Sequence, residues 1–123
     1  MNISESFLWI IMFVSVIIVD LCIVISGYTM EKHIPKDRFG HVGYRTKRSR
    51  QSEEAWQYAN KLAGKVFFRM GLIMTVISVA IMLIVMKTEP FKMIYTGVAV
   101  LIAESVIVCF PIIYIEKKLK EKF

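Results

Sequence analysis

The chain has 123 residues, of which 56% are hydrophobic, and a formal net charge of +6. This apolar fraction exceeds what a soluble domain of this size can bury, and the charged residues gather in 31–69 and 116–122. The segregation predicts one all-α integral membrane domain, in which the basic excess sets orientation and attracts anionic lipid headgroups. A nucleic-acid-binding protein is therefore not expected. The two cysteines lie in apolar segments and cannot form a disulfide framework.

Three apolar segments are each long enough to cross a bilayer as a helix, for which about 20 apolar residues suffice. They cover residues 7–30, 63–86 and 91–115. Ser4 is the expected N-cap of the first segment, and Pro90 suits the first turn of the third. Pro111 should kink the third segment near its end. The first segment lacks a preceding basic region, so we expect a retained span rather than a cleaved signal peptide.

Residues 31–62 form the longest polar stretch and connect the first two spans. Pro35 ends any helical continuation of the first span, and Gly43 marks a turn. Ser52 is followed by two glutamates, and this resembles a helix start because carboxylates are favourable in the positive first turn. We therefore expect a helix to begin near Ser52, to lie partly at the membrane interface, and to run on into the second span.

Lysine and arginine residues are distributed unequally between the two ends of the spans. Most of them lie in the loop 31–62 and in the C-terminal tail, whereas the opposite side has only Lys87 and Lys92. By the positive-inside rule, the loop and the C-terminus are predicted to be cytoplasmic and the N-terminus to lie outside.

Two acidic residues interrupt the apolar spans. Measured from the cytoplasmic ends, Asp20 lies about ten residues into the first span and Glu104 about eleven into the third. Both are therefore expected near the bilayer midplane, where a charge costs roughly 2.5–3.5 kcal/mol on insertion scales. Two facing carboxylates cannot both ionise cheaply, so at least one should be protonated. Thr75 and Ser78 of the second span are candidate hydroxyl partners at a comparable depth.

Two interpretations of this polar group stay open. It is either a neutral, hydrogen-bonded clamp that holds the three helices together, or a proton- or cation-responsive site.

The most specific pattern lies in the polar loop and the helix after it, and reads G-Y-R-T-x2-S-x2-S-x3-W-x3-N-x3-G. Its members are Gly43, Tyr44, Arg45, Thr46, Ser49, Ser52, Trp56, Asn60 and Gly64. The pattern resembles the signature of the SdpI-type immunity family, small bacterial membrane proteins related to those that protect cells from a secreted toxic peptide. The resemblance implies a three-span module in the bacterial cell (inner) membrane and a role in toxin immunity.

The chain departs from this family at Phe39, where members often have an asparagine four residues before the glycine. If that asparagine makes a structural hydrogen bond, this chain must make it in another way. Arg45 can bond two oxygens with its guanidinium fork. Its expected partners are a lipid headgroup, a peptide terminus, or one of Glu53 and Glu54 at the following helix start.

The function implied by the resemblance is resistance to a membrane-active peptide toxin, with the bilayer and the toxin as partners. The residues leave two alternatives open: a small proton- or ion-coupled transport or sensing protein, and a signalling subunit whose basic loop holds a cytosolic protein. No zinc spacing, phosphate loop or nucleophile motif appears, so we predict no enzyme activity, catalytic residue, cofactor or metal. A homo-oligomer stays open because three spans bury little surface.

Overall fold

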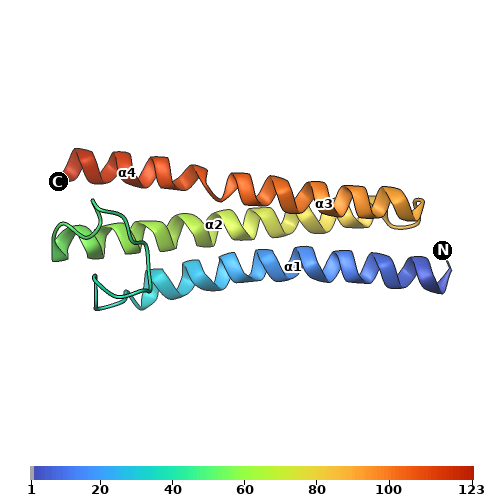
Figure 1. The fold of residues 1–123 in the computed structure, drawn as a ribbon, viewed down its shortest axis with the longest axis horizontal. Helices are drawn as coiled ribbons and strands as arrows, with labels where there is room; N and C mark the ends of the chain where they lie inside the picture. The colour runs from blue at the N-terminus through green and yellow to red at the C-terminus, as the bar shows by residue number, and fades with distance from the viewer. Residues whose placement is uncertain (1) are drawn as a thin grey trace.

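The computed structural model describes residues 2–123. Its helices are α1 (Ile3–Lys32), α2 (Glu53–Val85), α3 (Pro90–Ile107) and α4 (Phe110–Lys122), and the described residues contain no strand. α4 follows α3 almost end to end, so the chain forms three long rods that lie side by side (Figure 1). Ile3–Lys32, Glu53–Val85 and Pro90–Lys122 are each long and apolar enough to cross a membrane. The predicted class, an all-α multi-pass membrane protein, is confirmed.

α2 is the central element, because it packs against each of the other three helices. α1 packs along α2, and α3 contacts both α1 and α2. The start of α1 and the α2–α3 connection lie at one end of the bundle (Figure 1). The loop between α1 and α2 lies at the other end, together with the C-terminus. Both basic segments of the sequence therefore share one end.

The start of α2 agrees with the prediction, whereas the start of α1 does not. Ser52 is the N-cap of α2, and its hydroxyl accepts a hydrogen bond from Ala55 N at 3.1 Å. The cap of α1 is Asn2 rather than Ser4. Asn2 Oδ1 accepts from Glu5 N at 2.8 Å, and Glu5 Oε2 accepts from Asn2 N at 3.1 Å. This reciprocal capping box satisfies two backbone donors, so the helix begins earlier than expected.

The third rod is interrupted where Pro111 predicts a kink. A proline lacks the N–H that would bond to the carbonyl four residues earlier, so a regular helix cannot pass through this point. The chain forms a short turn instead, in which Cys109 N donates to Val106 O at 3.1 Å. The helix then resumes and continues to Lys122, beyond the end at residue 115 that the sequence suggested. The charged C-terminal tail is therefore helical.

α1 and α2 approach each other closely at glycines. A Cβ atom on Gly27 would collide with the backbone nitrogen of Phe68, and one on Gly64 would collide with the backbone of Glu31. Gly64 is the last residue of the loop motif, and its place in the fold is this close helix crossing.

Candidate functional site

The loop between α1 and α2 is attached to α2 through the buried side chain of Asn60. Asn60 Oδ1 accepts a hydrogen bond from Tyr44 N at 2.7 Å, and Asn60 Nδ2 donates to Trp56 O at 2.9 Å. Because Asn60 is completely buried, it provides a partner for a backbone N–H that water cannot reach. The amide side chain thus fixes Tyr44 at one point of the α2 surface.

Gly43 makes this attachment possible. Its φ angle is +104°, a region that residues with a side chain rarely adopt. A Cβ atom at this position would also lie 2.6 Å from Asn60 Oδ1. Both the backbone turn and the space beside Asn60 therefore require glycine.

The remaining motif residues close the loop on itself. The buried Ser49 hydroxyl accepts from Thr46 N at 2.8 Å, and Thr46 Oγ1 accepts from Ser49 N at 3.1 Å. Ser49 Oγ also lies 3.1 Å from Tyr44 O. The indole N–H of Trp56 donates to Pro35 O, which holds the beginning of the loop against α2. We define Tyr44, Ser49, Trp56 and Asn60, whose bonds hold the loop in place, as the loop clamp.

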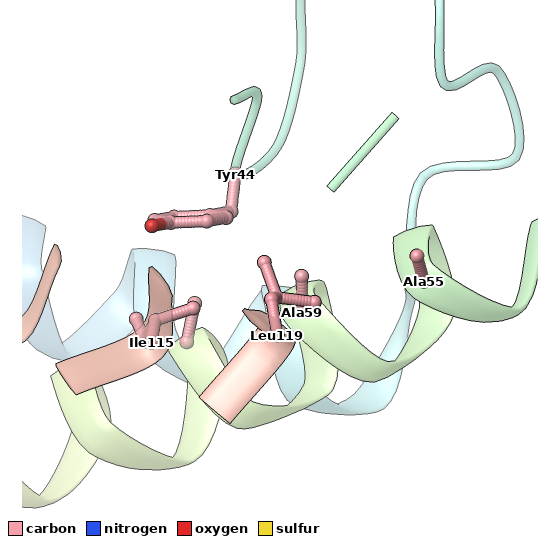
Figure 2. Close-up of a cluster of buried hydrophobic side chains, with 6 residues drawn as sticks. Tyr44, Ala55, Ala59, Ile115 and Leu119 are labelled. Carbon is pink, nitrogen blue, oxygen red and sulfur yellow. The ribbon is translucent and has the colours of Figure 1, made fainter. Parts of the chain in front are cut away.

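The side chain of Tyr44 connects the loop to α4. Its ring reaches from the loop toward Ile115 and Leu119, which pack on the alanine face of α2 at Ala59 (Figure 2). The Tyr44 hydroxyl donates to Glu116 Oε1 at 2.8 Å. Burial of the ring and the neighbouring Glu116 carboxylate raise the pKa of Tyr44 above its usual range. The phenol therefore keeps its proton at physiological pH and stays a hydrogen-bond donor.

Glu116 is a residue of this site that the sequence did not reveal. Besides its bond to Tyr44, its Oε2 lies 3.6 Å from Arg48 Nη1, so two loop residues converge on one carboxylate of α4. Glu116 is 72 positions from Tyr44. No local sequence pattern relates residues so far apart, and Glu116 is only one of several charged residues in the C-terminal tail.

Arg45 is exposed and takes no part in the ion pairs among residues 2–123. The anticipated pairing with the start of α2 is made by Arg38 instead, whose Nη1 lies 3.7 Å from Glu53 Oε2. The turn around the exposed Phe39 is closed by Asp37, whose Oδ1 accepts from Phe39 N at 2.9 Å. A side chain two residues earlier thus provides a local hydrogen bond at this turn.

A second polar group lies inside the helix bundle, far from the loop. Asp20 of α1, Ser78 of α2 and Glu104 of α3 are all buried. The Ser78 hydroxyl donates to Glu104 Oε1 at 2.6 Å. Thr75, the other expected hydroxyl partner, donates instead to Gly71 O of its own helix at 2.7 Å. We define Asp20 and Glu104 as the acid pair. Within residues 2–123 no cluster of three or more His, Cys, Asp or Glu side chains could hold a metal ion.

Comparison with known proteins places the chain in a family. A model described as the SdpI/YfhL protein family matches residues 36–115. The match covers the loop motif, all of α2 and α3, and the first turns of α4. Searches of curated proteins and of solved structures each found no match.

Proposed function

Because the chain belongs to the SdpI/YfhL protein family, we propose that it is an immunity protein that protects its cell membrane from a membrane-active peptide toxin. The observation that carries this proposal is the family match, which spans 36–115 and contains the complete loop motif. The protein would act inside the bilayer, either by binding and neutralising the peptide or by shielding its target.

The surface of the helices supports an action within the bilayer. α3 exposes a row of large apolar side chains, which are Phe91, Ile94, Tyr95, Val98 and Ile102. A surface of this kind is stable against lipid tails, and it is equally open to an apolar peptide dissolved among them. A hollow of about 360 Å³ lies along this row. The lipid-facing side of α3 is therefore the first place to seek toxin contacts.

In the proposed orientation, contacts between the toxin and the parts of the protein outside the bilayer would contribute little to binding. With the N-terminus outside, the external parts are the start of α1 and the short α2–α3 connection from Met86 to Glu89. A peptide that arrives from outside meets little polar surface there. The large polar loop would face the cytoplasm, where its exposed Arg45 and Lys47 can contact anionic headgroups.

The proposal is tested by expressing the chain in a toxin-sensitive bacterium and measuring survival against a panel of membrane-active peptides. We expect wild-type protein to increase survival with at least one peptide relative to the empty vector. Asn60→Ala should reduce this protection because it opens the loop clamp. Gln57→Ala, on the exposed face of the same helix, should protect like the wild type. Immunoblots of membrane fractions separate lost protection from lost protein. Survival equal to that of the empty vector across the panel contradicts the proposal.

A second candidate function is the recruitment of an acidic cytosolic protein to the loop. The observation that favours it is a hollow of about 420 Å³ lined by Lys47, Arg48, Gln51 and Glu116. Reversing one charge with Lys47→Glu should weaken the binding of such a partner. It should leave the survival of cells exposed to the toxin unchanged. If Lys47→Glu does not change the binding of any cytosolic protein to the loop, this candidate is excluded.

A further inference from the structure

The acid pair lacks the hydrogen bonds that buried carboxylates normally have. Asp20 is 0% exposed and Glu104 is 4% exposed. Both oxygens of Asp20 and Oε2 of Glu104 have no hydrogen-bond partner among residues 2–123. The two carboxyls nevertheless lie close enough to interact electrostatically. Three buried acceptor atoms therefore face a region that contains no matching donor.

No basic side chain within the spans can neutralise the pair. α1 contains no Lys, Arg or His before Lys32, α2 contains none between Arg69 and Lys87, and the third rod contains none between Lys92 and Lys117. The nearest acid on α4, Glu116, is bonded to Tyr44. Buried carboxylates are usually paired with a cation or protonated. Since the spans supply no cation, the positive charge must come from outside them.

The other titratable groups of the spans near this depth are the two cysteines. Cys22 and Cys109 are exposed on the outer surface of the bundle rather than buried with the pair. α2 contributes the Ser78 hydroxyl, which already donates to Glu104 Oε1. Asp20 therefore depends on Glu104 for a polar partner.

The protonation states differ in how well they satisfy these atoms. With no proton, two negative charges face each other in a medium of low dielectric constant, and three acceptors stay unbonded. With two protons, both carboxyls carry a hydroxyl that needs an acceptor. With one proton, the hydroxyl of one carboxyl donates to the carboxylate of the other. This state gives both acids a partner and leaves a single charge, which Ser78 also stabilises.

We propose that Asp20 and Glu104 form one binding site for a single exchangeable proton at the centre of the bundle. The site goes beyond the immunity function and does not depend on it. Ser78 lies nine residues from both Arg69 and Lys87, which places the site midway between the charged residues that border the apolar part of the second span. The shared proton joins α1 to α3, and Ser78 holds Glu104 on α2. Release of the proton leaves two facing carboxylates and weakens the packing of α3 on α1.

A hollow between α2 and α3 gives access to this site. Its volume is about 110 Å³, and its lining is apolar except for Ser78 and Glu104. A metal ion would need several further oxygen ligands, which this lining does not offer. The hollow is large enough for a water molecule, whose share of liquid volume is about 30 Å³.

Infrared spectroscopy of the full-length protein in lipid nanodiscs tests the proposal. The signal is the C=O stretching band of protonated carboxyl groups, followed during a pH titration in sodium-free buffer. We expect the wild type at neutral pH to show one protonated carboxyl per chain, which loses its proton as the pH rises. The double variant Asp20→Asn/Glu104→Gln should lose this band. Glu89→Gln removes an exposed carboxyl and should retain it.

The number of protonated carboxyl groups per wild-type chain tests the proposed proton site without any variant. A wild-type protein with no protonated carboxyl at neutral pH, or with two per chain, overturns the proposal. A second titration in sodium chloride identifies the cation. If tenfold more sodium moves the pH of deprotonation downward by about one unit, as competition for one site requires, the ligand is a metal ion and the proton site is refuted. An unchanged midpoint supports the proton.

Discussion

Removal of the Asn60 side chain is the most direct test of how the loop is held. Asn60→Ala deletes the acceptor that Tyr44 N reaches at 2.7 Å, at a position that is fully buried. An unsatisfied buried donor costs about 1–3 kcal/mol. The lost bond to Trp56 O adds little, because that carbonyl also accepts the helical bond of α2. We take a total of about 2 kcal/mol, which increases the open population of the loop roughly 30-fold.

The assay is amide hydrogen exchange at Arg50, measured by NMR on the protein in detergent micelles. Arg50 N donates to Thr46 O at 3.1 Å inside the loop, so it reports loop opening without being a partner of Asn60. When opening and closing are fast, the exchange rate follows the population of the open state. We therefore expect exchange at Arg50 to become roughly 30-fold faster in Asn60→Ala.

Gln57→Ala is the matched control, since Gln57 lies on the same helix but is exposed and makes only a 3.4 Å contact with Glu53. Surface changes of this kind usually alter stability by less than about 0.5 kcal/mol. If Arg50 exchanges in Asn60→Ala within about twofold of its rate in this control, the loop does not depend on the buried amide. The reasoning about the loop clamp would then be wrong.

The remaining predictions concern the helix crossing, the link to α4 and the orientation. Gly64→Ala should destabilise the protein by about 1–3 kcal/mol, seen as a lower unfolding midpoint in detergent, because the new Cβ meets the backbone of α1; an unchanged midpoint contradicts this. Tyr44→Phe should accelerate exchange of α4 amides, whereas Tyr114→Phe, on the exposed face of α4, should not. Because the pKa of Tyr44 is raised, its stabilising contribution is present below about pH 10 and is lost as the pH rises further, so the protection of wild-type α4 amides relative to their base-catalysed intrinsic exchange should begin to fall only above that pH. In a cysteine-free background, an impermeant maleimide should label Asn2→Cys in intact cells and Gln51→Cys only after permeabilisation; the reverse pattern would invert the proposed topology.

The features that the sequence predicted are those set by local rules. Apolar segment length predicted three membrane-crossing rods, the Ser52 hydroxyl predicted the start of α2, and Pro111 predicted the interruption of the third rod. Each depends on residues within a few positions of one another. The helical tail was missed because its charges suggested a solvated end, although Ile115 and Leu119 lie four residues apart on one face. Both are fully buried, and this helical spacing was the available signal.

The contacts of the candidate sites could be predicted only in part. The loop motif and the acids inside the spans stood out in the sequence, but most of their partners did not. Tyr44 donates a hydrogen bond to Glu116, and Trp56 donates one to the carbonyl of Pro35, although many residues separate each pair in the sequence. Such pairings follow from how the helices pack, and packing is not encoded in any short window. Equal depth suggested that Ser78 could meet Glu104, since depth is read from distance to the span ends.

The loop clamp and the acid pair are related through α2, because both lie on the same face of that helix. Asn60 and Ser78 are 18 residues apart, which is five turns and about 27 Å along the axis. With Ser78 at the bilayer centre, the edge of a hydrocarbon core of about 30 Å falls near Arg69, and Asn60 lies outside it. A shift of α2 along its axis would therefore alter the loop contacts and the Ser78–Glu104 bond together. The close crossing at Gly64, between the two, opposes such a shift and keeps both sites in register.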